Sequence, residues 1–209
     1  MTGRIVSPGM TEVTWAADGS DAAVAALVAS VVTRPGRVTL CLPGGATPVP
    51  VFKALAAMRL PWEQVTIVPG DERQVPYDHP ASNFGLLRAA FGATGATIEP
   101  LSLGMSLPRF ALVWLGLGMD GHMASLFPSS DPDASAPSQV IDVTPEPLPP
   151  GAPFSRLTLT LAALADADGV IIVARGAKKR QVIEAALAGA DLPLTRLFAM
   201  TPVELFWCL

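Results

Sequence analysis

Short, uninterrupted apolar runs are the feature that most restricts how this chain can fold. They occupy residues 38–42, 65–68, 110–115 and 169–173, and glycine- or proline-containing turns follow most of them. A strand that is apolar on both sides must be covered on both faces, as strands of a parallel sheet are. Helical segments alternate with these runs, so we expect an α/β fold. The expected architecture is a three-layer α/β/α sandwich around a Rossmann-like, mostly parallel sheet.

Local signals predict the remaining elements of a single domain that spans residues 1–209. Helices are expected at 21–33, 49–58, 82–91, 162–168 and 176–187. Further strands are expected at an edge within 1–19 and at 140–143, 156–161 and 195–200, with a loop over 92–109 and either strand or helix over 203–209. Thr47 is expected to cap the helix 49–58, with Pro48 as its first residue. A short helix is expected after the glycine-rich turn that begins at Gly116.

Composition and charge argue against several classes of protein. The net charge of −4 provides no basic surface for nucleic acid or anionic membranes. The apolar run 22–32 is too short to span a bilayer and lacks the basic flank of a signal peptide. Cys41 and Cys208 have no metal-ligand spacing, which favours a reduced cytoplasmic protein over a disulfide or a metal site.

Two loops that follow predicted strands carry residues suited to binding anions. Gly44, Gly45 and Thr47 lie between a strand and a helix, where backbone N–H groups, the helix N-terminus and a hydroxyl suit a phosphate group. The alternative is an ordinary tight turn before a capped helix. Asp71 and Arg73 follow the next strand, and Arg73 could clamp an oxyanion. The alternative there is a solvated loop.

A third loop supplies the best candidate for proton transfer. His122 follows Asp120 in a glycine-rich turn at the end of the run 110–115, and a histidine there can act as a general base near neutral pH. The alternative is a loop histidine that hydrogen-bonds only to the backbone. The other histidine, His79, lies in a polar loop and is expected to be exposed. A basic set, Arg156, Arg175, Lys178, Lys179 and Arg180, is either a solvated face or, through Lys179, a phosphate contact.

Together these segments resemble the 6-phosphogluconolactonases, which belong to a wider sugar-phosphate isomerase group. The most specific match is the segment 116–128, followed by 71–76 with Ser82-Asn83 and by 44–48; the segments 156–160 and 176–179 match less distinctively. Arg73 and the segment 124–128 match the lactonases better than the related glucosamine-6-phosphate deaminases.

The resemblance implies hydrolysis of 6-phosphoglucono-δ-lactone to 6-phosphogluconate, in the oxidative pentose phosphate pathway and without metal or organic cofactor. It implies that His122 activates water, that Asp120 orients the histidine loop and that Arg73 stabilises the developing oxyanion. The residues expected to hold the sugar phosphate are Gly44, Gly45, Thr47, Asp71, Arg156 and Lys179. A deaminase/isomerase and a non-catalytic sugar-phosphate sensor remain alternatives, and the oligomeric state stays open.

Overall fold

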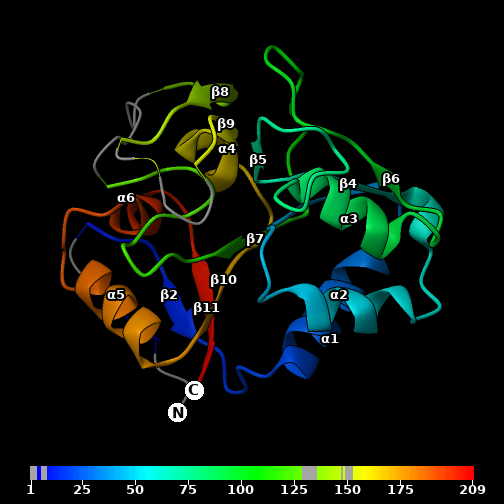
Figure 1. Cartoon of the computed structure of the whole chain (residues 1–209). Helices are drawn as coiled ribbons and strands as arrows, with labels where there is room; N and C mark the ends of the chain where they lie inside the picture. Colours follow the sequence, from blue (N-terminus) through cyan, green and yellow to red (C-terminus); the bar gives the residue numbers. More distant parts are fainter. Residues whose placement is uncertain (1–3, 6–8, 129–135, 147, 149–152) are drawn as a thin grey trace.

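The computed structural model describes residues 4–5, 9–128, 136–146, 148 and 153–209. Its centre is an eight-stranded sheet with the order β1-β2-β11-β10-β7-β3-β4-β6 (Figure 1). Neighbouring strands are parallel, except that β1 pairs antiparallel with β2 at one edge. The strands are β1 (Arg4–Ile5), β2 (Val13–Trp15), β3 (Val38–Leu42), β4 (Val65–Pro69), β6 (Thr97–Ile98), β7 (Leu112–Gly116), β10 (Val170–Arg175) and β11 (Val203–Cys208).

Helices cover both faces of this sheet, so the molecule has the three layers expected from the sequence (Figure 1). The helices are α1 (Asp21–Val32), α2 (Val49–Ala56), α3 (Asn83–Phe91), α4 (Leu161–Ala165), α5 (Ala177–Leu187) and α6 (Pro193–Met200), with a 3-10 turn at Trp62–Gln64. Buried residues of α1, α2 and α3 form one hydrophobic cluster with the sheet, and those of α4, α5 and α6 form the other. In the described part of the chain, no helix combines the length and the apolar character needed to cross a bilayer.

The central strands are buried on both faces because their side chains alternate between the two clusters. Leu40 and Leu42 of β3 pack with α1–α3, whereas Cys41 packs on the opposite face. Leu112 and Val113 of β7 divide in the same way. Continuous apolar runs are therefore required here, and this is why the sequence identified these strands.

The order of the strands reverses between β3 and β7. From β3 the chain moves outward through β4 to β6, and it then returns to place β7 on the other side of β3 before continuing to β10 and β11. The loops that leave β3 and β7 at their carboxyl ends diverge, which opens a crevice between them. In open α/β sheets this switch point is where ligands bind.

A second, antiparallel sheet lies beside the crevice and consists of β5 (Asp71–Arg73), β9 (Arg156–Leu159) and β8 (Val140–Val143). Asp71 pairs with Thr158, and Arg73 pairs with Arg156. The 71–73 segment, which the sequence placed in a loop, is thus held as a strand.

Further local expectations were wrong. Residues 193–200 form helix α6 rather than a strand at 195–200, because Leu194, Leu197 and Phe198 have helical spacing behind a proline in the first turn. Thr47 does not cap α2; Pro48 occupies the N-cap position, and no side chain bonds to that helix end.

The short helix expected after the glycine-rich turn is also absent from the described residues 117–128, which form turns. Ala124 has a φ of 48°, in the left-handed region that an α-helix cannot include. The segment 92–109, expected to be a loop, contains the short strand β6, and the segment 203–209, left open between strand and helix, contains β11.

Glu72 fastens the second sheet to helix α3. Its side chain is 4% exposed and accepts hydrogen bonds from the backbone N–H groups of Arg73, Asn83 and Phe84 and from the Ser82 hydroxyl, at 2.6–3.1 Å. A carboxylate is favoured there because it faces several donors at the start of a helix. Glu72 therefore has a structural function next to the crevice.

We expect Glu72→Gln to lower the free energy of unfolding by about 1.5–3 kcal/mol, since the amide places a donor against donors. Chemical denaturation of the variant against wild type measures this loss. Glu63→Gln, at an exposed carboxylate of the 3-10 turn, is the control and should change the free energy little. Equal stability of the two variants would show that these bonds contribute no net stability.

Candidate active site

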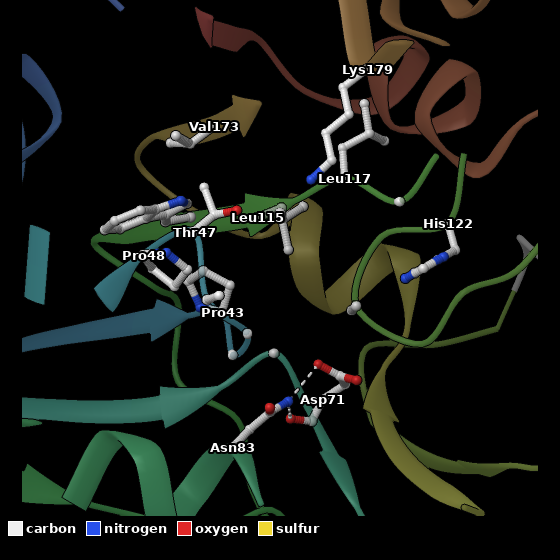
Figure 2. A pocket seen from close by; sticks show the side chains of 18 of the residues that line it. Pro43, Thr47, Pro48, Asp71, Asn83, Leu115, Leu117, His122, Val173 and Lys179 are labelled. Atoms are coloured by element: carbon white, nitrogen blue, oxygen red, sulfur yellow. Dashed lines mark hydrogen bonds between the residues drawn. The ribbon is translucent and has the colours of Figure 1, made fainter. Parts of the chain in front are cut away.

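A pocket of about 360 Å³ occupies the switch point (Figure 2). Its volume lies in the range of small-molecule sites, roughly 300–1,000 Å³. The loops after β3, β4 and β7 form its walls, and α5 contributes one side chain. Among the residues expected at the site, the following line the pocket: Gly44, Gly45, Thr47, Asp71, Arg73, His122 and Lys179. Asp120 and Arg156 do not line it.

The loop after β3 brings backbone close to the pocket. A Cβ on Gly44 would lie 1.7 Å from Oδ1 of Asn83, so only glycine allows this loop to pack on that buried amide. Gly45 has a φ of 84°, which also favours glycine. Thr47 lies on the pocket wall ahead of α2, and its hydroxyl is free of any capping role. This wall combines N–H groups, a hydroxyl and a helix start, as an anion site requires.

Lys179 brings a positive charge to the same pocket from the first turn of α5. Figure 2 shows its side chain extending from the helix toward Leu117 and into the pocket. Burial lowers the pKa of the Lys179 amine, and the charge of Arg175 lowers it further. Lys178, its neighbour in the chain, is exposed and does not line this pocket.

Asp71 is held at the base of the pocket by donors from three different segments. It is 6% exposed; its Oδ2 accepts from the Ser125 hydroxyl at 2.6 Å, and its Oδ1 accepts from the Asn83 amide at 3.0 Å. Nε of Arg73 and Nη1 of Arg156 each lie 3.8 Å from the same Oδ2. The carboxylate is thus fixed in position, and it organises the two arginines around it.

Arg73 lies at the edge of the pocket, and one hydrogen bond restrains its guanidinium. Nη1 donates to the carbonyl oxygen of Ala81 at 3.0 Å. The buried Nε has no hydrogen-bond partner among the residues that the structure describes. Buried donors of this kind are rare in the absence of a ligand or water, so the guanidinium is suited to donate a hydrogen bond to an oxygen atom of a bound molecule.

His122 enters the pocket from the loop after β7, opposite the wall formed by the loop after β3 (Figure 2). Its Nδ1 lies 2.6 Å from Oδ1 of Asp120, and its ring stacks against Phe127 with centroids 4.7 Å apart. Burial acts to raise the pKa of Asp120, but the charge and hydrogen bonds of His122 outweigh it, so this pKa is lowered. The carboxylate is therefore ionised at neutral pH and can hold an N–H of the imidazole.

Gly118 makes the contact between Asp120 and His122 possible. A Cβ at this position would lie 2.2 Å from Nδ1 of His122 and 2.4 Å from Oδ1 of Asp120. The Gly118 N–H also donates to the His122 carbonyl oxygen at 2.8 Å, which closes the turn. The second glycine of this motif is thus required by the close approach of the two side chains.

The structure changes the assignment of two residues: one expected in the pocket lies outside it, and one not expected there lines it. Arg156 was expected to bind the substrate, but its side chain is 3% exposed and lies behind Asp71 and Ser125, outside the pocket lining. Asn83 was part of the segments that resemble the family but was given no role at the site, yet it lines the pocket and fixes Asp71. Its position between a capping serine and an apolar helix face gave no local sign of this contact.

The chain is similar to known proteins along nearly its whole length. A family model described as glucosamine-6-phosphate isomerases/6-phosphogluconolactonase matches residues 14–100 and 93–207. The 6-phosphogluconolactonase of Pseudomonas putida is 35% identical over 210 residues, which cover 88% of this chain and 85% of that protein. The corresponding protein of Caulobacter vibrioides is 34% identical over 215 residues, with coverage of 90% and 91%.

Solved structures show the same likeness. A 6-phosphogluconolactonase from Shewanella baltica superimposes with a TM-score of 0.79 at 26% identity, covering 98% of this chain and 99% of that one. A monomeric glucosamine-6-phosphate deaminase has a TM-score of 0.76 at 16% identity, with coverage of 93% and 96%. At that identity the deaminase shares the fold, and the similarity carries no further argument.

Proposed function

Because the chain belongs to the glucosamine-6-phosphate isomerase/6-phosphogluconolactonase family, we propose that it hydrolyses 6-phosphoglucono-δ-lactone to 6-phosphogluconate. The observation that carries the proposal is the meeting of two sets of residues in one pocket. A phosphate-type wall with Lys179 faces a histidine that a carboxylate orients, with Arg73 at the edge. The relatives of 31–35% identity that are named 6-phosphogluconolactonase support this activity within the family. The reaction belongs to the oxidative pentose phosphate pathway, and we propose that it takes place in the cytoplasm.

In the proposed reaction His122 acts as the general base. With its Nδ1–H donated to Asp120, Nε2 is left with a lone pair that takes a proton from a water molecule. The water oxygen adds to the lactone carbonyl carbon, and the guanidinium of Arg73 stabilises the negative charge that develops on the carbonyl oxygen. The bond from that carbon to the ring oxygen then breaks, and the ring oxygen receives the proton.

The substrate is oriented by its phosphate group. We propose that Gly44, Gly45, Thr47 and Lys179 hold it, far enough from His122 to leave the lactone ring between them. Asp71 contributes by keeping Arg73 in place. Arg156, being buried, is assigned to the support of this site rather than to the substrate.

The test is an assay of freshly prepared 6-phosphoglucono-δ-lactone with the purified chain, with acid release followed against buffer alone. We expect hydrolysis well above the spontaneous rate and no ammonia from glucosamine 6-phosphate. Ammonia release would identify a deaminase instead. Binding of 6-phosphogluconate without any acceleration would identify a sensor, and either result would overturn the proposal.

Lys179 gives the phosphate part of the proposal a test of its own. We expect Lys179→Met to weaken the binding of 6-phosphogluconate about 10–100-fold, since one charged hydrogen-bond partner is lost. In wild type, affinity should fall as pH rises and the amine loses its proton, and the lowered pKa moves this fall to a lower pH than for an ordinary lysine. Calorimetric titration with this stable product measures both effects.

Lys178→Met is the matched control, because it removes the same charge from the adjacent exposed position. Its affinity should stay close to that of wild type. If both variants bind equally well and show the same dependence on pH, Lys179 does not hold the phosphate.

A further inference from the structure

The hydrogen bond to Asp120 restrains His122 incompletely. It holds one ring nitrogen, at 2.6 Å, and the partner carboxylate belongs to a side chain that is 57% exposed. The histidine side chain is 33% exposed, so protein contacts cover only part of it. The direction of Nε2, which the proposed reaction uses, therefore needs a second restraint on the plane of the ring.

Phe127 supplies a contact of the required kind. Its ring is 5% exposed and lies against the imidazole with centroids 4.7 Å apart and an angle of 31° between the planes. Aromatic rings at this centroid separation attract one another beyond their area burial, and the contact changes when one ring rotates. The contact of Phe127 with the face of the imidazole and the hydrogen bond of Asp120 at its edge together define the position and the plane of the imidazole ring.

Arg156 in turn holds Phe127. The guanidinium carbon lies 5.3 Å from the centre of the phenyl ring, within the range of a cation–π contact. The same guanidinium donates to the Ser125 hydroxyl at 3.3 Å and lies 3.8 Å from Asp71. This buried cation therefore links the histidine loop to β5 and β9, the strands beneath the pocket.

We propose that Phe127 and Arg156 are positioning residues, which fix the plane of the catalytic imidazole through the column Arg156–Phe127–His122. The inference rests on the proposed function, because it concerns the histidine that activates water there. It replaces the substrate-binding role that the sequence suggested for Arg156. Neither residue touches the substrate, so their loss should affect turnover and leave binding intact.

The main test compares Phe127→Leu with Phe127→Tyr. Leucine removes the planar face, and we expect kcat for lactone hydrolysis to fall about 10-fold with KM unchanged, since small misplacements of catalytic groups cost up to about 10²-fold. Tyrosine keeps the face and should retain kcat. Phe127→Met, a flexible apolar replacement of about the same volume as leucine, should match leucine and serves if the leucine variant does not fold.

The chain offers a matched control in its other histidine. His79 contacts Phe154, with ring centroids 5.4 Å apart, away from the pocket. Phe154→Leu removes an aromatic–histidine contact of similar chemistry and should leave both kcat and KM unchanged. A loss of kcat in this variant equal to that of Phe127→Leu would overturn the inference.

Arg156→Lys tests the second half of the column. Lysine keeps the charge but not the planar group over the ring, and we expect a several-fold lower kcat. In the Phe127→Leu background the same change should have a clearly smaller effect, because the ring through which Arg156 acts on His122 is gone and only its contacts to Asp71 and Ser125 remain. The inference would be overturned if the double variant lost kcat by the full product of the two single losses. It would also be overturned if Arg156→Lys raised KM and left kcat unchanged.

A readout without turnover separates this inference from the proposed function. Diethyl pyrocarbonate modifies histidines, and mass spectrometry follows the chain's two histidines separately. Phe127→Leu should speed modification of His122 and leave His79 unchanged, and Phe154→Leu should do the reverse. Unchanged modification of His122 overturns the column even where the chain is an active lactonase; faster modification supports it even where lactone hydrolysis is absent.

Discussion

His122→Ala is expected to lower kcat for lactone hydrolysis by about 10²–10⁴-fold, the contribution of a positioned general base. The affinity for 6-phosphogluconate should change little, since the phosphate-type wall lies on the opposite side of the pocket. Stopped assays of acid release, corrected for spontaneous hydrolysis, provide kcat and KM. Calorimetry with the product provides the affinity.

His79→Ala is the control for this prediction. It removes the only other histidine, which lies in the loop before α3 and outside the pocket. Its kcat should equal that of wild type. If His122→Ala retains full turnover, the general base is another group. The proposed lactonase activity itself is tested separately, by the assay of the wild-type protein.

Arg73→Met is expected to lower kcat by about 10²–10³-fold, as the loss of one donor to a developing oxyanion does in other enzymes. The physical reason is the position of the guanidinium in the pocket lining, with a buried Nε that makes no hydrogen bond to the described residues. Arg73→Lys should recover only part of the loss, because an ammonium group cannot reproduce the planar fork of donors. Steady-state kinetics on the three proteins measure this order.

The free energy of unfolding of each Arg73 variant has to be measured alongside its kinetics, because Arg73 also contacts the Ala81 carbonyl and the Asp71 carboxylate. Arg88→Met is the matched control: Arg88 lies over the ring of Phe84 on α3, outside the pocket. It should leave kcat unchanged. A higher KM with an unaltered kcat in Arg73→Met would instead assign Arg73 to the phosphate and not to the oxyanion.

The strands were predictable because their requirement is local. A run such as 38–42 must be apolar throughout when both faces are covered, and the strand β3 has those bounds. Helix starts were predictable where a side chain caps the helix, as Ser20 and Ser82 do. The starts of α2 and α5 were also predicted, although no side chain caps them, but the capping role given to Thr47 was wrong and α6 was taken for a strand.

The sequence by itself determined which residue types stand at the ends of which strands: glycines and Thr47 after β3, Asp71 and Arg73 after β4, and His122 after β7. It could not determine that these ends meet, because the strand order depends on how distant segments pack. Tertiary structure alone also decided that Arg156 is buried behind Asp71 and that Asn83 supports it. These contacts join segments far apart in the chain, so no local pattern of spacing or polarity records them.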